Sequence, residues 1–325
     1  MKVLVIGAAG MIGRKLCERL LKDGRIGGVA ITGLVMADAV TGDPGGDSSF
    51  AQYLVVDLAH PDAAGVLLAS RPDLIFHLAA VVSGEAEQDF DKGYAVNLDG
   101  TRALFEAIRV TENYTPRVVY TSSIATFGAP YRGAIADEFF HTPLSSYGTQ
   151  KAICELLLAD YSRRGFLDGV GIRLPNICVR PGKPNAASSG FFSSIIREPL
   201  AGREAILPVA DSVRQTHASP RATVEFLLHA ATLDSDALGH RRTLMMPGVP
   251  ASIAEQIDAL RRVAGAAVAA RVRHVPDPAI MAMVAGWPTS FDTPRALSLG
   301  FRAESSFEVI IRTHIHDDLG GKFVS

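Results

Sequence analysis

Short, largely apolar segments alternate with amphipathic ones along the first half of the chain. The apolar segments are residues 2–6, 30–37, 52–56, 74–77, 117–120 and 169–174. Between them lie segments whose apolar residues recur at helical spacing, such as the one that ends at Gly24 and the one that follows Ser146. Strands that are apolar throughout are typical of parallel sheets buried on both faces. The alternation predicts an α/β fold, a doubly wound parallel sheet with helices on both faces.

A glycine-rich turn, GAAGMIG, joins the first apolar segment to the first amphipathic one. A strand, a glycine turn and a helix in this order bring backbone N–H groups and a positive helix terminus to a place where a pyrophosphate can bind. A tight turn without a ligand is the alternative, but the context favours a Rossmann-type dinucleotide site. The predicted cofactor contacts in this turn are Gly7, Gly10, Met11, Ile12 and Gly13.

Further candidate cofactor contacts follow the next apolar segments. Asp38 can accept hydrogen bonds from the adenosine ribose and would repel a 2′-phosphate. No Lys or Arg follows Asp38 before Arg71, which favours NAD over NADP. The sequence separation between Gly13 and Asp38 is longer than usual, so an Asp that merely ends the strand is the alternative. The other predicted contacts are Asp57 and Leu58 near the adenine, and the small-residue run Leu78, Ala79 and Ala80.

Tyr147 and Lys151 stand one helical turn apart in the motif YGTQK. An ammonium group beside a phenol favours the phenolate, which is a usable base. Ser123 ends the apolar segment upstream, and parallel sheets bind ligands outside the carboxyl ends of their strands. The three residues therefore predict an acid/base site, although Tyr and Lys four residues apart also occur by chance.

Composition limits the classes of partner. The 325 residues carry a formal net charge of −2, which gives no electrostatic footprint for nucleic acid or for an anionic membrane. The three cysteines lie in apolar segments without metal-ligand spacing, so we expect buried thiols in a reducing compartment and no metal. No apolar run approaches the length of a membrane span, and the first residues lack the pattern of a signal peptide, which predicts a cytoplasmic protein.

Several motifs together resemble the extended short-chain dehydrogenase/reductases, the group of NAD-dependent epimerases and dehydratases: GAAGMIG, HLAA, TSSIATFG, YGTQK, RLPN, VRQTHAS and FDTPRALSLGF. The resemblance implies a Rossmann domain over residues 1–178 and a smaller C-terminal substrate-binding lobe over 179–325, with about 210–248 returning to the sheet. It also implies NAD as cofactor and a homodimer. By the same likeness Tyr147 is the acid/base and Lys151 holds the nicotinamide ribose and lowers the tyrosine pKa. Ser123 binds the reacting oxygen, Asn97 supports the site and Pro175 contacts the cofactor.

The substrate is expected to be a small sugar acid. Asn176 and Arg214 match family positions that bind substrate, but Gln215 and Ser219 replace two acidic ones. Arg180 and Lys183 can neutralise a small carboxylate, and a diphosphate or simple solvation are the alternatives. Ser83 is a further candidate contact. The resemblance is greatest to the subgroup that oxidises D-erythronate, a four-carbon sugar acid, at its C2 hydroxyl; L-threonine and uronate dehydrogenases are relatives that also act on small carboxylates.

Two other functions stay open. A nucleotide-sugar epimerase with tightly bound NAD would return the hydride to an intermediate and release no NADH. Its dehydratase relatives commonly use Asp-Glu where this chain has Ser123-Ile124, which disfavours dehydration. A dinucleotide-sensing regulator would bind the cofactor without turnover, but the Tyr147 and Lys151 pair argues against that class.

Overall fold

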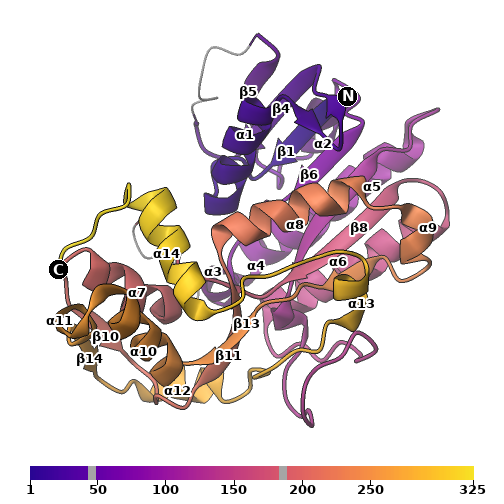
Figure 1. Cartoon of the computed structure of the whole chain (residues 1–325). Helices are drawn as coiled ribbons and strands as arrows, with labels where there is room; N and C mark the ends of the chain where they lie inside the picture. Colours follow the sequence, from indigo (N-terminus) through magenta and orange to yellow (C-terminus); the bar gives the residue numbers. More distant parts are fainter. Residues whose placement is uncertain (43–48, 183–188) are drawn as a thin grey trace. The chain divides into compact units, whose positions relative to one another are not determined.

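The computed structural model describes residues 1–42, 49–182 and 189–325 (Figure 1). The chain forms two compact units. Unit 1 comprises 1–126, 145–174 and 224–244, and unit 2 comprises 127–144, 175–223 and 245–325. Residues 127–144, which the sequence prediction assigned to the first domain, belong to unit 2.

Unit 1 is built on a seven-stranded sheet. Its strand order is β12 (Thr243–Met245), β8 (Asp168–Leu174), β7 (Arg117–Ser123), β6 (Leu74–His77), β1 (Lys2–Ile6), β4 (Gly33–Asp38) and β5 (Ala51–Val55). The five pairings from β8 to β5 are all parallel. The order reverses at β1, so the gap between the carboxyl ends of β1 and β6 is the switch point where such sheets bind ligands. The predicted doubly wound sheet is confirmed.

Three strands differ in their boundaries from the prediction: β4, then β5, which covers 51–55 instead of 52–56, and β8, which begins at Asp168 instead of residue 169. β4 begins at Gly33 instead of residue 30, because Ala30 pairs with Arg25 in a two-residue hairpin of β2 (Arg25–Ile26) and β3 (Val29–Ala30). As predicted, β7 ends in Thr121, Ser122 and Ser123, which pair with β8 as far as Leu174. These polar residues are therefore part of the sheet.

Helices α2 (Ala63–Leu68), α5 (Thr101–Val110) and α6 (Ser146–Arg163) pack against one another and cover one face of this sheet. Leu4, Ile75, Phe105, Val118 and Leu158 are part of the core between these helices and the strands. In Figure 1, α8 (Pro220–Thr232) crosses the near face of the sheet. An ion pair from Arg19 to Glu225 links α8 to α1 (Met11–Asp23). The burial of both faces explains why the central strands β1, β4 and β6 are largely apolar.

The helical segment between β6 and β7 is interrupted. It consists of α3 (Ser83–Gln88), α4 (Phe90–Gly93), a π-helical stretch at Tyr94–Gly100 and then α5. Wider π-helical turns are uncommon and occur frequently at functional sites. The stretch contains Asn97, and it ends at Gly100, where a Cβ would lie 2.8 Å from the Leu58 carbonyl oxygen.

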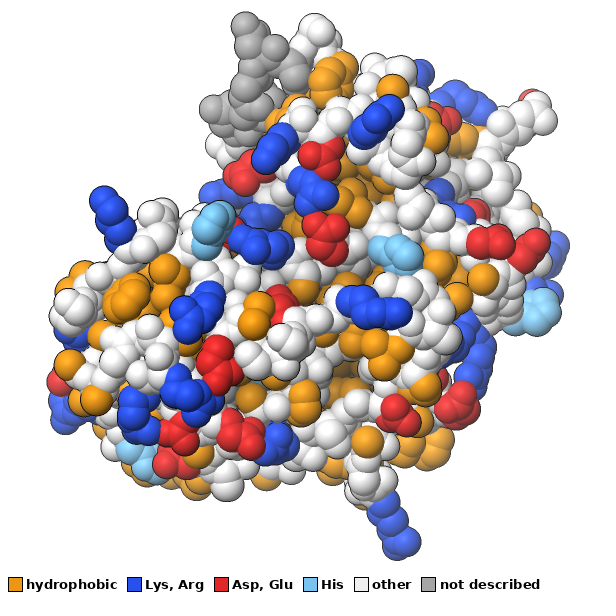
Figure 2. Space-filling view, in the orientation of Figure 1, with side chains coloured by type: hydrophobic (Ala, Val, Ile, Leu, Met, Phe, Trp, Pro, Cys, Tyr) orange, Lys and Arg blue, Asp and Glu red, His pale blue; other side chains and the backbone are white. Residues whose placement is uncertain are grey.

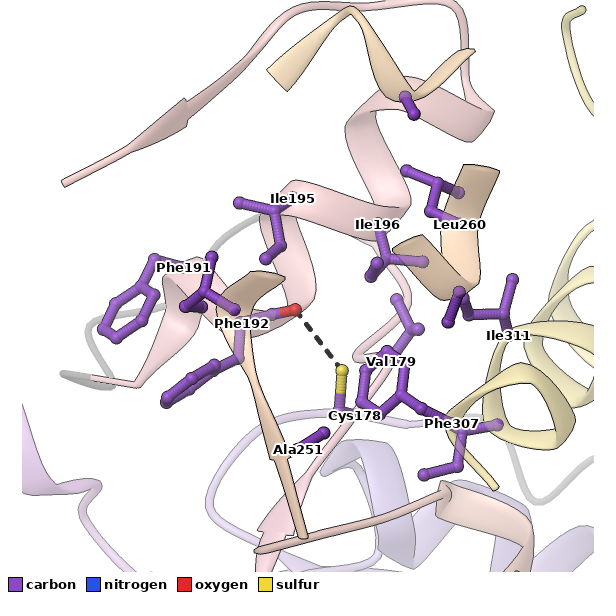
Figure 3. Close-up of a cluster of buried hydrophobic side chains, with 14 of the residues drawn as sticks. Cys178, Val179, Phe191, Phe192, Ile195, Ile196, Ala251, Leu260, Phe307 and Ile311 are labelled. Carbon is purple, nitrogen blue, oxygen red and sulfur yellow. Dashed lines mark hydrogen bonds between the residues drawn. The ribbon is translucent and has the colours of Figure 1, made fainter. Parts of the chain in front are cut away.

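Unit 2 has its own core and two small sheets. Strands β13 (Val249–Ser252), β11 (Arg214–Ala218) and β9 (Asn176–Ile177) form one sheet, and β10 (Ala205–Leu207) pairs with β14 (Val272–His274). Its helices are α7 (Gly190–Leu200), α10 (Ile253–Ala264), α11 (Ala266–Ala269), α12 (Pro278–Val284), α13 (Pro294–Ser298) and α14 (Phe307–Asp318). Figure 3 shows Cys178 and Val179 packed among side chains of α7, α10 and α14. Ser252 and Glu255 form a capping box at the start of α10.

The charges on the visible surface are mixed in sign, and the cysteines are buried. On the face seen in Figure 2, blue cationic and red anionic side chains are interspersed, with no extended field of one sign. All three cysteines, Cys17, Cys154 and Cys178, are buried and form no disulfide. Among the described helices, none is both long and apolar enough to cross a membrane.

Candidate active site

The glycine turn lies at the switch point of the sheet. Gly7 adopts φ +92°, and a Cβ there would lie 2.6 Å from the backbone nitrogen of Ala79, which follows β6. At Gly13, in the first turn of α1, a Cβ would lie 2.0 Å from the Gly7 carbonyl oxygen. Both positions therefore require glycine, and the turn keeps its backbone close to the helix terminus. This geometry fits a pyrophosphate on the N-terminus of α1.

Asp38 is tied to this turn. It ends β4, and its carboxylate accepts a hydrogen bond of 2.9 Å from the backbone N–H of Ala9. The second carboxylate oxygen accepts a hydrogen bond from the Val40 N–H at 3.3 Å. The acidic group is thus held beside the glycine turn, where a carboxylate can accept hydrogen bonds from a ribose. The described residues of this region fit a dinucleotide.

The other predicted cofactor contacts cluster at the same edge. The backbone N–H groups of Leu78 and Ala79 both donate to the carbonyl oxygen of Ile6, which fixes the small-residue run against the end of β1. Asp57 accepts a hydrogen bond from the Ala59 N–H, and Leu58 is buried against the π-helical stretch. Pro175, in contrast, lies at the first residue of a unit 2 segment.

Asn97 joins three segments of unit 1. Its side chain is buried, accepts from the Val81 N–H at 2.8 Å, and donates to the Val81 carbonyl oxygen at 3.0 Å. It also donates to Gln150 Oε1 on α6 at 2.7 Å. The amide therefore fixes the chain after β6 to the helix that carries Tyr147. The supporting role that the resemblance implies for Asn97 stays a prediction.

Helix α6 presents Tyr147 and Lys151 to the end of β7. Ser145 caps the helix by accepting a hydrogen bond from the Gly148 N–H. The Lys151 Nζ atom lies 5.8 Å from the centre of the Tyr147 ring, and it donates a hydrogen bond of 2.8 Å to the Thr121 carbonyl oxygen. Thr121 lies two residues before Ser123, whose hydroxyl accepts from the Ala125 N–H at 3.1 Å. The three predicted catalytic residues therefore belong to one connected part of unit 1.

The charge on Lys151 is buried. Only 2% of the residue is exposed, and this burial lowers its pKa to about 8, with Cys154 and Glu155 acting in the opposite direction. The ring of Tyr120 lies 4.7 Å from Nζ and provides a cation–π contact. An ammonium with few solvent contacts interacts more strongly with a neighbouring phenol than an exposed one does.

The predicted substrate residues of unit 2 differ in their surroundings. Asn176 is buried, and its Nδ2 lies 3.1 Å from Nδ1 of His217, whose pKa burial lowers to about 3. Arg180 donates from Nε to the Ile177 carbonyl oxygen at 3.2 Å and from Nη2 to the Ser189 hydroxyl at 3.0 Å. Arg214 forms an ion pair of 2.7 Å with Glu255 at the surface.

The other two predicted substrate residues are Ser83 and Lys183. Ser83 is the first residue of α3 in unit 1, where it follows the run after β6. Lys183 lies outside the described residues. The substrate candidates are therefore divided between the two units, with Ser83, Ser123 and Tyr147 in unit 1 and Asn176, Arg180 and Arg214 in unit 2.

The sequence prediction missed a set of buried polar residues around the predicted catalytic pair. Glu155, two turns after Tyr147 on α6, forms an ion pair with Arg173 of β8 and accepts a hydrogen bond from Ser122. His77 lies 3.0 Å from the Thr101 hydroxyl, which donates to the Asn97 carbonyl oxygen. The continued i, i+4 spacing from Tyr147 through Lys151 was the one signal that pointed to Glu155.

Comparison with known proteins identifies the family. The model described as "NAD dependent epimerase/dehydratase family" matches residues 3–230. The chain belongs to this family, which confirms the predicted class and implies a nicotinamide dinucleotide as cofactor.

Two relatives are similar to this chain along nearly its whole length. The chain is 45% identical over 321 residues to a D-erythronate dehydrogenase of Cupriavidus necator, a match that covers 98% of both chains. It is 40% identical to the D-erythronate dehydrogenase of Haemophilus influenzae, over 98% of this chain and 100% of that protein. The predicted resemblance to this subgroup and the prediction of a dehydrogenase of this family are confirmed.

A solved structure is also similar. The crystal structure named as the nucleoside-diphosphate-sugar epimerase from Agrobacterium tumefaciens is 58% identical, with a TM-score of 0.95, over 99% of this chain and 95% of that one. This likeness confirms the fold, with its seven-stranded sheet and the smaller C-terminal sheets.

The glycine turn gives a direct test of the dinucleotide site. Gly13→Ala places a Cβ 2.0 Å from the Gly7 carbonyl oxygen, so the turn must move and NAD binding should weaken by tenfold or more. Gly65→Ala is the matched control. Gly65 lies in α2 with open space around its Cβ position, and alanine there should stabilise the helix by up to about 1 kcal/mol. Calorimetric titration with NAD measures both variants; equal affinities would contradict the assignment of the turn.

Proposed function

We propose that this protein is an NAD-dependent dehydrogenase that oxidises the C2 hydroxyl of a small sugar acid of the D-erythronate type to the 2-oxo acid. The observation that carries the proposal is the full-length similarity to two D-erythronate dehydrogenases. The buried ammonium of Lys151 beside Tyr147 supports it, because this arrangement suits proton removal from a hydroxyl group.

In this proposal Tyr147 is the acid/base. Its phenolate, favoured by the neighbouring ammonium, takes the proton of the C2 hydroxyl. Ser123 donates a hydrogen bond to the reacting oxygen and so orients it, and Asn97 holds the segment after β6 against α6. The nicotinamide dinucleotide, when bound, accepts the hydride from the same carbon.

The cofactor is proposed to be NAD and not NADP. Asp38 keeps a carboxylate beside the glycine turn, where it can accept hydrogen bonds from ribose hydroxyls and repels an added phosphate. Lys151 would bind the nicotinamide ribose. The remaining proposed contacts are Gly7, Gly10, Met11, Ile12, Gly13, Asp57, Leu58, Leu78, Ala79, Ala80, Asn97, Tyr147 and Pro175.

For the substrate carboxylate we favour Arg180 over Arg214. The backbone of Arg180 is held on both sides, because its N–H donates to the Ser193 hydroxyl and its carbonyl oxygen accepts from Arg197. Its guanidinium is oriented by hydrogen bonds to neutral oxygens. A guanidinium fixed in this way binds a carboxylate with little loss of side-chain entropy. Asn176, Ser83 and Lys183 are proposed as further substrate contacts.

We also propose a cytoplasmic homodimer. Leu156 on α6 and Val110 at the end of α5 are more than half exposed, and both helices belong to the layer on one face of the sheet. A second copy of the chain would bury these side chains.

The alternative is a nucleotide-sugar epimerase with tightly bound NAD. The observation in its favour is the name of the similar Agrobacterium tumefaciens structure. Such an enzyme would interconvert a UDP-sugar and release no NADH, which distinguishes it from a dehydrogenase.

Absorbance at the NADH band, with NAD and a panel of C4 to C6 sugar acids and UDP-sugars, tests the proposal. Signal is expected with D-erythronate or a close relative and not with UDP-sugars. Tyr147→Phe should lower kcat by at least 1,000-fold, roughly the upper part of the range for an acid/base group, while NAD affinity stays within twofold. A Tyr147→Phe enzyme that keeps its activity would remove this residue from the acid/base role.

Arg180→Ala should raise the KM for the sugar acid by about 10- to 100-fold, the equivalent of a charge-assisted hydrogen bond, and leave the KM for NAD unchanged. Arg214→Ala is the matched control and should change the sugar-acid KM less than threefold, because Arg214 is paired with Glu255. If Arg214→Ala raised the sugar-acid KM more than Arg180→Ala did, the substrate carboxylate would be assigned to Arg214 instead.

The lowered pKa of Lys151 predicts two pH effects. kcat should fall as the pH rises through about 8, since Lys151 then loses its charge. The folded-state pKa lies below the ordinary 10.5, so the unfolded chain binds the proton more tightly between these values. The contribution of Lys151 to the free energy of unfolding should therefore increase from pH 8 to 10.5. Lys151→Met removes this contribution. The free energy of unfolding of both proteins is measured at pH 7 and pH 10, and an equal change between the two pH values would contradict the lowered pKa of Lys151.

A further inference from the structure

Tyr147, Lys151 and Glu155 form a single stripe on α6. They are spaced by four residues, so a phenol, an ammonium and a carboxylate follow one another along the side of the helix that meets the sheet. Lys151 and Glu155 are almost fully buried. The first two residues have proposed roles in the chemistry, and Glu155 has none.

Glu155 is paired with Arg173 in a geometry that uses both carboxylate oxygens. Arg173 Nε lies 3.0 Å from each oxygen, and its Nη2 lies 2.6 Å from Oε2. The exposed fractions of the two side chains are 8% for Arg173 and 2% for Glu155. A pair this deeply buried gains strength from its low-dielectric surroundings but pays a large desolvation penalty. Stability alone is therefore a weak reason for a charged pair at this position.

The position of the pair relates it to the proposed active site. Arg173 of β8 is the register partner of Ser122 of β7, and the Ser122 hydroxyl donates to Glu155 Oε1. One residue earlier, the Thr121 carbonyl oxygen accepts the hydrogen bond from Lys151. The stripe is thus attached to two successive residues of β7 and to the adjacent residue of β8. The next residue of β7 is Ser123.

We propose that Glu155, Arg173 and Ser122 form a clamp that positions Tyr147 and Lys151 relative to Ser123. Glu155 is a positioning residue, which acts through the helix stripe and through Ser122. This inference rests on the proposed function, because it assumes that the phenol and the Ser123 hydroxyl meet the same substrate oxygen. Misplacement of a catalytic group by about 1 Å can cost about 100-fold in rate, so a rigid link at this point has a large effect.

The chain contains a matched control. Arg117 and Asp168 are register partners at the opposite ends of the same two strands, and they form an ion pair of 2.6 Å. Asp168 also contacts Ser235 and Arg242. This second pair joins the same strands away from the carboxyl ends. It therefore separates the effect of losing an ion pair from the effect of losing the clamp.

The decisive experiment compares Glu155→Gln, the double variant Glu155→Met with Arg173→Met, and Asp168→Asn. Glu155→Gln leaves a buried guanidinium without its charge partner and should lower both Tm and kcat. The double variant replaces the pair with apolar side chains of similar length, which often restores stability. Its Tm should recover to within a few degrees of wild type, whereas kcat should stay at least tenfold lower and NAD affinity within twofold. Asp168→Asn should lower Tm with kcat within twofold.

A double variant with both Tm and kcat at wild-type values would overturn the clamp. The kcat is measured on whichever substrate the wild-type enzyme converts, so a failure on sugar acids alone rejects the proposed substrate and not the clamp. A crystal structure of the double variant tests the clamp without any substrate. The clamp predicts a shift of the Ser123 hydroxyl relative to Tyr147 by about 1 Å; unchanged positions would reject it even if no substrate is found.

Discussion

A buried ammonium group is the constraint on which the architecture of the candidate site depends. Lys151 is inside unit 1, and an unpaired charge there would be very unfavourable. The structure compensates it with the Thr121 carbonyl oxygen, the face of Tyr120 and the nearby carboxylate of Glu155. Each of these groups comes from the end of β7 or from α6. The contacts that stabilise this charge therefore also set the geometry of the candidate site.

The second constraint is the close approach of chain segments at the switch point. Gly7 and Gly13 leave no room for a Cβ, and Asp38 holds the turn by its hydrogen bond to the Ala9 N–H. Together with the buried side chains of β1 and β6, these contacts within unit 1 fix the turn. The dinucleotide site that the family membership implies and the predicted acid/base site can in this way be built on one sheet edge.

Much of this could be predicted from the sequence because it depends on local patterns. Largely apolar segments predicted the parallel sheet, the glycine spacing predicted the turn, and the four-residue spacing predicted the Tyr147 and Lys151 pair. The π-helical stretch around Asn97 was missed, since one wider turn leaves the apolar periodicity almost unchanged. The ion pair of Glu155 with Arg173 was also missed. Its partners lie 18 residues apart, and only the packing of α6 on β8 brings them together.

In the proposed reaction, a hydride leaves C2 of a small sugar acid and is released as NADH. Mass spectrometry of the reduced cofactor, after reaction with D-erythronate carrying deuterium at C2, tests this reaction most directly. The reduced cofactor is expected to contain one deuterium and to accumulate in proportion to the 2-oxo acid. Reduced cofactor without deuterium would contradict oxidation at C2. A deuterium that returns to the sugar, with no net NADH, would contradict the dehydrogenase itself.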